Sequence, residues 1–178
     1  MTGKRSTFPR VPQDSYSTPA EAVAPLLPHL EPGSRFFEPC AGEGRLIEHL
    51  VNAGHICVGR CDLPTDARTW RYLSIESGVI FITNPPWSRP ALHDIIVNLS
   101  NQAPAWLLLD SDWAHTRQSI PYLPRLQKIV SVGRLKWIEG SPHTSKDNAA
   151  WMLFTLPRPD ERAVTHFIGR TDSMRMAA

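Results

Sequence analysis

The sequence contains little of what marks secreted, metal-binding or membrane-spanning proteins. It has only three cysteines, Cys40, Cys57 and Cys61, and this low, odd number excludes a disulfide framework. No cluster of His or Cys lies beside Cys57 and Cys61 to complete a zinc site, so we expect no metal. No apolar run approaches the roughly 20 residues that cross a bilayer. Residues 1–15 lack the apolar region of a secretory signal, so a cytoplasmic protein is expected.

Acidic residues are scarce in one stretch, although the charge of the whole chain is nearly balanced at +2. Between His115 and Lys146 the only acid is Glu139. Such a stretch can face a polyanion, and an ordinary solvated cationic surface is the alternative. Its basic side chains are Arg117, Arg125, Lys128, Arg134, Lys136 and Lys146.

Strand-like and helix-like segments alternate along the chain. Strand followed by helix, repeated, predicts a parallel sheet with helices on both faces. The last two strands are joined by a loop too short for a crossover helix, so they should pair antiparallel. We therefore expect an α/β, Rossmann-like, doubly wound and mostly parallel sheet with one antiparallel strand near its edge. The predicted strands are 35–40, 55–62, 78–86, 104–112, 129–139 and 149–157, and the predicted helices begin within 16–30, 44–54 and 89–102.

The ends of the chain differ from its centre in composition. Residues 1–14 read as a flexible basic arm, residues 15–158 as a single domain, and residues 159–178 as a loosely ordered tail. The first helix has a start signal: Thr18 as N-cap, Pro19 at the first helical position and Glu21 completing a capping box.

A glycine turn, EPCAGEG at residues 38–44, joins the first strand to a helix. Gly42 and Gly44 allow the backbone to approach a ligand, since glycine has no Cβ. Asp62 ends the next strand and could accept both hydroxyls of a ribose. Ligands of such sheets bind at the carboxyl ends of the strands, where these residues lie. The turn therefore indicates an adenosine-containing cofactor, although a plain tight turn would look similar.

The acids in this turn disfavour a nicotinamide dinucleotide. That cofactor requires a third glycine where the sequence has Ile47. Glu38 and Glu43 would also repel a pyrophosphate. Glu38 instead suits an ammonium or sulfonium group, so we expect a positively charged cofactor.

A second unusual motif, Asn84-Pro85-Pro86-Trp87, ends the third predicted strand. The side-chain oxygen of Asn84 and the carbonyl of Pro85 could accept the two N–H bonds of a planar amine. The prolines fix φ, so the carbonyl is in place before a substrate arrives. Trp87 could stack on the ring that bears the amine; a core tryptophan is the simpler alternative. Such a base must be flipped out of a duplex or be unpaired.

Together these motifs resemble the class I S-adenosylmethionine-dependent methyltransferases, and more narrowly those that methylate adenine N6 in DNA. The small size of the chain resembles phage-type enzymes, which implies a bacterial or phage-infected host cell. The resemblance covers roughly residues 16–157, including YSTP at 16–19. It implies a methyltransferase domain, S-adenosyl-L-methionine as cofactor, DNA as partner, and catalysis by the Asn84–Trp87 motif. The implied cofactor contacts are Tyr16, Thr18, Pro19, Glu38, Pro39, Cys40, Ala41, Gly42, Gly44, Asp62, Asp66 and Asn84. The candidate nucleic-acid contacts are Arg117, Arg125, Lys128, Arg134, Lys136, His143, Ser145 and Lys146.

The chain departs from that family pattern between Asp62 and Val79. This span is short and shows no clear third strand, so Asp66 is the one candidate for contact with the adenine of the cofactor. With no separate target-recognition domain expected, loops would supply any sequence preference. RNA adenine, cytosine N4 and protein glutamine present the same planar amine, and a non-catalytic nucleic-acid-binding module is a further alternative. The sequence gives no indication of oligomeric state.

Overall fold

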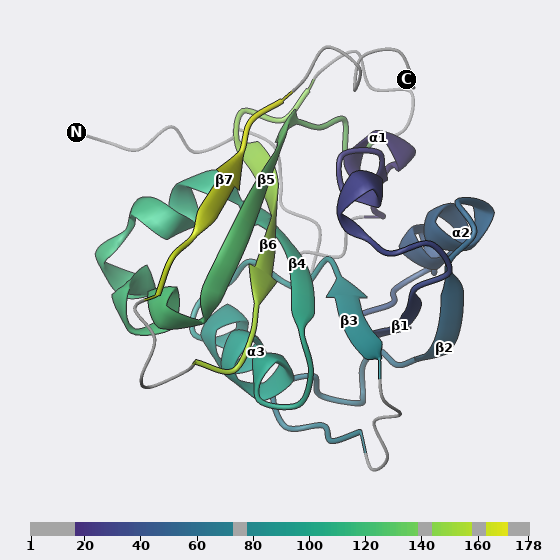
Figure 1. The fold of residues 1–178 in the computed structure, drawn as a ribbon, viewed down its shortest axis with the longest axis horizontal. Helices are drawn as coiled ribbons and strands as arrows, with labels where there is room; N and C mark the ends of the chain where they lie inside the picture. The colour runs from purple at the N-terminus through teal and green to yellow at the C-terminus, as the bar shows by residue number, and fades with distance from the viewer. Residues whose placement is uncertain (1–16, 73–77, 139–143, 158–162, 171–178) are drawn as a thin grey trace.

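The computed structural model describes residues 17–72, 78–138, 144–157 and 163–170, which form a mixed sheet of seven strands with helices on both faces (Figure 1). Within these ranges, no helix combines the length and apolar character needed to traverse a membrane. The strands are β1 Arg35–Glu38, β2 Ile56–Arg60, β3 Val79–Thr83, β4 Ala105–Asp110, β5 Leu126–Arg134, β6 Asn148–Phe154 and β7 His166–Ile168. The helices are α1 Ala20–Val23, α2 Arg45–Asn52 and α3 Ala91–Ser100, with the 3-10 helices η2 Leu27–His29, η3 Ser111–His115 and η4 Arg117–Arg125.

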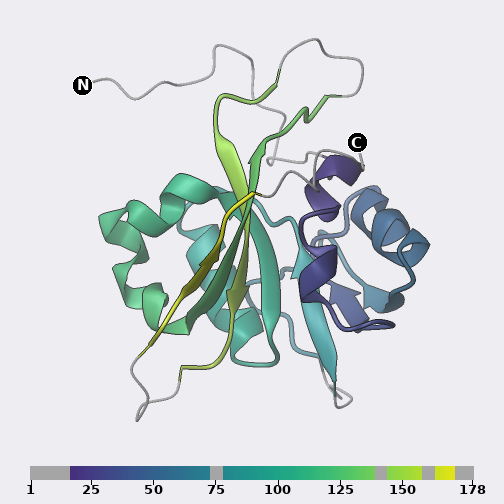
Figure 2. The ribbon, with the colours of Figure 1, turned by 45° about the horizontal axis from the view of Figure 1, so that its top comes forward.

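The strand order is β2-β1-β3-β4-β6-β5-β7, and only β6 runs against its neighbours. The expected mostly parallel sheet with one reversed strand is therefore confirmed. Because β6 is reversed, β5 again runs in the direction of β4. The carboxyl ends of β1, β3, β4 and β5 thus share one edge, where the β5–β6 hairpin projects beyond the sheet at the top of Figure 2. We call this the carboxyl edge.

Two buried clusters, one on each face, hold the layers together. Neighbouring residues of a strand point to opposite faces, so Phe37 joins the cluster beneath α3 and Phe36 the cluster beneath α1 and α2. Trp151 on β6 fixes α1 to the sheet, since its indole Nε1 donates a 2.7 Å hydrogen bond to the carbonyl of Ala22.

The start of α1 differs from the prediction. Thr18 is buried but does not cap the helix; Pro19 is the N-cap residue, and no side chain caps the helix. The helix has only four residues because Pro25 has no N–H to continue it. The Glu21 carboxylate, expected to complete a capping box, instead accepts the backbone N–H of Lys136 at 2.9 Å.

The segment predicted to be a loosely ordered tail contains β7. This strand pairs parallel with β5, and the hydroxyl of Thr165 donates to the carbonyl of Leu126 at its start. The sequence did not indicate the strand because its side chains are mostly exposed, so no alternation of apolar residues marks it. Between β2 and β3, by contrast, residues 61–72 contain no strand, in agreement with the prediction.

Candidate active site

Glu38 is a buried carboxyl group at the end of β1, beside β3. Its exposed fraction is 1%, and its Oε2 has no hydrogen-bond partner within the described structure. The hydroxyl of Thr83, at the end of β3, lies beside Glu38 and favours its ionised form, although no described group forms a well-oriented hydrogen bond with that hydroxyl. Burial, and secondarily the charge of Asp62, raise the pKa of Glu38 well above its usual range, and Arg60 offsets only part of this. Among the described residues, Arg60 and the hydroxyl of Thr83 favour the ionised form but do not outweigh its burial, so a cationic or donor ligand would stabilise an ionised Glu38 further.

The glycine turn lies against the end of β2. Gly42 and Gly44 have φ of 48° and 84°, in the left-handed region that favours glycine, and Gly44 is the N-cap of α2. Ala41 N–H donates to the carbonyl of Cys61, and Cys61 N–H donates to that of Glu38. These bonds hold the turn beside the exposed Asp62, so that one ligand could contact both the turn and Asp62.

The thiols of Cys40 and Cys61, both in this region, are uncharged and pack against the hydrophobic cluster beneath α3. Burial raises the pKa of Cys40 to about 12 and that of Cys61 to about 11. At neutral pH both stay protonated, and the thiol of Cys61 donates a weak 3.5 Å hydrogen bond to the carbonyl of Pro39. Cys40 is thus a packing neighbour of Glu38 rather than a reactive group.

The segment before α1 approaches the glycine turn. The hydroxyl of Ser17 donates to Oε2 of Glu43 at 2.8 Å, and Thr18 is buried. Pro19 is half-buried, while Tyr16 lies outside the described residues. The structure therefore brings this segment to the turn, as the resemblance implies.

Asn84 begins the Pro-rich motif directly after β3, at the same edge as Glu38. Asn84 and Pro86 are half-buried and Pro85 is buried. Trp87 is half-buried as well, with its Nε1 donating a 2.9 Å hydrogen bond to the carbonyl of Leu108 on β4. This bond fixes the indole at the end of the sheet, between the two hydrophobic clusters, and both of them contact it.

A second tryptophan, Trp137, completes this region and was not predicted. It follows β5, and its ring meets Trp87 edge to face, with centroids 5.7 Å apart and an interplanar angle of 84°. The sequence placed it within the predicted strand 129–139, but β5 ends at Arg134, and the contact of Trp137 with Trp87 depends on β5 ending at the carboxyl edge. The two indoles form one aromatic wall.

Asp66 is already paired. The side chain of Arg68 donates to both of its carboxylate oxygens at 2.6–2.9 Å, and these bonds lower the pKa of Asp66. The segment is fixed to α3 by Asn98, whose Nδ2 donates to the carbonyls of Ala67 and Trp70. Contact of Asp66 with a cofactor adenine would have to compete with Arg68.

The basic residues of the predicted nucleic-acid contacts do not form one surface. Arg125 lies away from the carboxyl edge, donating to Ser100 Oγ at 2.9 Å and Asn101 Oδ1 at 2.7 Å. Lys128 lies over the ring of Trp106, 6.0 Å from its centroid. Arg117 is exposed at the start of η4, and His143 lies outside the described residues. At the projecting hairpin are Arg134, Lys136, Ser145 and Lys146.

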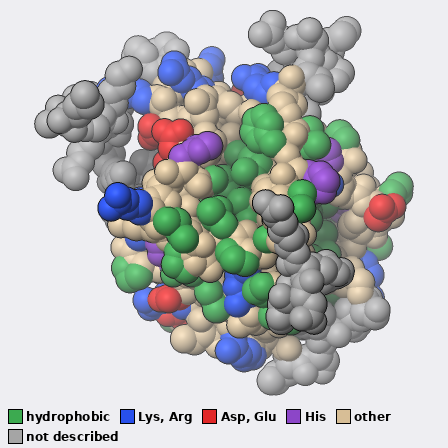
Figure 3. Space-filling model, turned by 60° about the vertical axis from the view of Figure 1, so that its left-hand side comes forward, with side chains coloured by type: hydrophobic (Ala, Val, Ile, Leu, Met, Phe, Trp, Pro, Cys, Tyr) green, Lys and Arg blue, Asp and Glu red, His purple; other side chains and the backbone are tan. Residues whose placement is uncertain are grey.

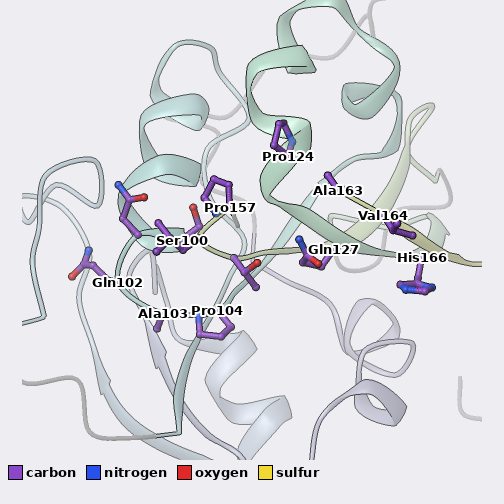
Figure 4. A pocket seen from close by; sticks show the side chains of 13 residues that line it. Ser100, Gln102, Ala103, Pro104, Pro124, Gln127, Pro157, Ala163, Val164 and His166 are labelled. Carbon is purple, nitrogen blue, oxygen red and sulfur yellow. The ribbon is translucent and has the colours of Figure 1, made fainter. Parts of the chain in front are cut away.

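A cavity of about 680 Å³ opens at the opposite edge of the sheet (Figure 4). Its walls come from the end of α3, the end of β6 and the residues before β7, including Gln102, Thr155 and His166. None of the candidate cofactor or catalytic residues lines it. The cavity is therefore separate from the motifs at the carboxyl edge.

Sequence comparison identifies no relative, because no protein-family model and no curated protein matches the chain. Solved structures do match. A class I S-adenosylmethionine-dependent methyltransferase assigned in Listeria monocytogenes aligns with a TM-score of 0.60 at 7% identity, covering 94% of this chain and 70% of that one. A proposed RNA methyltransferase from Pyrococcus horikoshii aligns at 0.53 and 16% identity, covering 85% and 91%. A type I restriction-modification methyltransferase subunit from Streptococcus thermophilus aligns at 0.52 and 11%, covering 91% of this chain and 52% of that subunit. At these identities the likeness shows the fold, which is that of the class I methyltransferases.

Proposed function

We propose that the protein is an S-adenosylmethionine-dependent methyltransferase that modifies the exocyclic N6 amine of adenine in DNA. The observation that carries the proposal is the placement of Asn84-Pro85-Pro86-Trp87 at the end of β3, next to the buried Glu38 at the end of β1. The class I methyltransferase fold supports the reaction class. Support for a nucleic-acid acceptor comes from two fold neighbours whose names refer to RNA modification and restriction-modification.

The residues of the glycine turn fit S-adenosylmethionine. The unpartnered, buried Glu38 carboxyl matches a ligand that carries an ammonium and a sulfonium group. Asp62 would accept the ribose hydroxyls. Gly42 leaves open space beside the backbone, whereas Nη1 of Arg60 lies 2.9 Å from where a Cβ on Gly44 would be. When bound, the cofactor supplies a sulfonium methyl carbon that passes to the acceptor nitrogen as one amine proton leaves for solvent.

The Pro-rich motif would hold and activate the acceptor. An exocyclic amine is a weak nucleophile because its lone pair is delocalised into the ring. The Asn84 Oδ1 and the Pro85 carbonyl would accept its two N–H bonds and increase electron density on nitrogen. Trp87, fixed through Leu108, would stack on the base, a contact that contributes about 1–3 kcal/mol. Positioning, rather than a strong base, would provide the rate.

A labelled-methyl assay tests the proposal. The protein is incubated with methyl-labelled S-adenosylmethionine and unmethylated duplex DNA, single-stranded DNA or RNA, and the nucleosides are separated. We expect label in N6-methyladenine from DNA. Asn84→Ala should abolish transfer while keeping cofactor affinity, and Asn52→Ala, an exposed asparagine on α2, is the matched control. Equal loss of transfer and cofactor affinity in Asn84→Ala would contradict its assignment.

RNA adenine is the second candidate acceptor, favoured by the Pyrococcus neighbour. Label in RNA alone would select it, and label in N4-methylcytosine or in protein would select the other planar amines. Absence of cofactor binding in titration calorimetry, with nucleic acid still bound, would instead indicate a binding module.

A further inference from the structure

We propose that β7 and Arg170 are part of the surface that binds nucleic-acid phosphates beside the acceptor site; the inference rests on the proposed function. β7 runs parallel to β5, with Phe167 opposite Ile129 and Ile168 opposite Val130. The residues after β7 therefore continue toward the carboxyl edge, where the candidate active site lies. Thr165 fixes the start of the strand to Leu126, which sets this register.

Arg170 reaches the base of the projecting hairpin. A Cβ built on Gly133 would lie 2.5 Å from Nη1 and 3.2 Å from Cζ of Arg170, so the guanidinium lies across the Gly133 backbone. Gly133 is buried and has a φ of +95°, a conformation that L side chains rarely adopt. Because Gly133 has no side chain, the Arg170 side chain can pack directly against its backbone.

The charge of Arg170 is available to a ligand. Arg170 is exposed, and no described acid forms an ion pair with it. Among the described residues of the hairpin at the same edge, three are exposed cations, Arg134, Lys136 and Lys146, and one is an exposed acid, Asp147; the exposed Glu21 of α1 also contacts the hairpin, at the backbone N–H of Lys136.

In Figure 3, Lys and Arg side chains lie along the upper margin, above a centre rich in hydrophobic side chains; others lie at the left and in the lower part of this face, and acidic side chains lie just below the upper ones. A cationic margin of this kind attracts the regularly spaced phosphates of a nucleic acid. Because the Arg170 side chain already lies against Gly133, binding a phosphate would cost it little conformational entropy.

A pair of charge-matched variants tests the inference. Arg170→Gln removes the proposed contact, whereas Arg71→Gln removes an exposed arginine at the opposite edge, where the neighbouring Tyr72 N–H donates to Gln102. The affinity for a fluorescein-labelled DNA oligonucleotide is measured by anisotropy between 50 and about 300 mM salt. One phosphate contact contributes about 0.9 to the slope of log K against log salt in duplex DNA, so Arg170→Gln should weaken binding about eightfold near 100 mM salt and flatten the slope by about one. Arg170→Lys, which keeps the charge, should retain most of the affinity.

The outcomes separate this inference from the proposed function. A wild-type protein that methylates DNA, with Arg170→Gln binding as well as Arg71→Gln, overturns the role of Arg170 and leaves the function intact. Equal loss in Arg170→Lys and Arg170→Gln overturns the phosphate contact as its basis. A wild-type protein that binds an acidic protein but no nucleic acid overturns both.

Discussion

Replacing Glu38 by glutamine should stabilise the ligand-free protein while weakening the binding of the proposed cofactor. Glu38 is 1% exposed and its Oε2 has no partner in the described structure. Leaving a buried group unpaired costs about 1–3 kcal/mol, and more when it is charged. A neutral glutamine could donate to the unpartnered hydroxyl of Thr83 beside it. Removing about 2 kcal/mol of this cost should raise the Tm by about 4–8 °C in a chain of this size.

The gain in stability should depend on pH with a defined sign. Burial raises the folded-state pKa of Glu38 above that of the unfolded chain, so the folded state holds its proton to higher pH. Wild-type stability is therefore intact below the unfolded pKa and is lost as the pH rises through the folded pKa. Glutamine does not titrate. Calorimetric Tm values should coincide for the two proteins at acidic pH and diverge as the pH rises through the folded-state pKa of Glu38.

Cofactor affinity provides the opposite readout for the same variant. A hydrogen bond to a charged group contributes about 1.5–3 kcal/mol, so Glu38→Gln should weaken S-adenosylmethionine about 10- to 100-fold in titration calorimetry. Glu48→Gln, an exposed acid on α2, is the control and should leave both measurements nearly unchanged. A lower Tm for Glu38→Gln at pH 8, or an unchanged cofactor affinity, would refute the reasoning.

Three further predictions concern other parts of the molecule. Asp62→Asn should weaken the cofactor without lowering the Tm, because the side chain is exposed; calorimetry that shows unchanged affinity would place the ribose partner elsewhere. Trp137→Ala should raise the KM for nucleic acid about two- to tenfold, since it removes the edge-to-face support of Trp87, while the cofactor KM stays constant and Trp137→Phe restores most of the loss. The buried ring of His93 accepts a hydrogen bond from Trp113 Nε1 at 3.2 Å, and burial lowers the pKa of His93. Stability that this histidine contributes above pH 6.5 should therefore be lost as the pH falls toward its folded pKa, and His93→Gln should show a shallower decline in Tm, with tryptophan fluorescence as a second probe.

The presence and direction of most strands could be predicted because local patterns determine them, whereas their order in the sheet was not predicted. The apolar run before Asn84 marked a buried strand, and the short loop between β5 and β6 required an antiparallel pair. The prediction for the start of α1 was wrong because the preference of a residue type for a capping position is only local. The hydrogen bond from Trp151 to the carbonyl of Ala22 fixes the position of the helix on the sheet. The carboxylate of Glu21 then accepts the backbone N–H of Lys136 instead of completing a capping box.

The candidate site could be predicted only in part because neighbours in sequence need not share an edge of the sheet. Arg125 and Lys136 belong to one basic stretch, yet β5 lies between them and separates them by its full length. Trp137 and Arg170 reach the carboxyl edge through the direction of β5 and β7, which no local pattern reveals. The sequence predicted that Asp66 contacts the cofactor adenine. It did not reveal that the backbone turn after Asp66 brings Arg68 into an ion pair with it.

Trp87 lies at the end of the sheet and contacts the hydrophobic clusters on both of its faces. Its N–H is bonded to β4, and its ring rests on the hydrophobic side chains above and below the strands. A molecule that stacks on this ring would therefore restrict a side chain that packs against both hydrophobic clusters. If the proposed acceptor site is correct, a base bound there should make α1 and α3 more rigid, and slower amide exchange in both helices would show it.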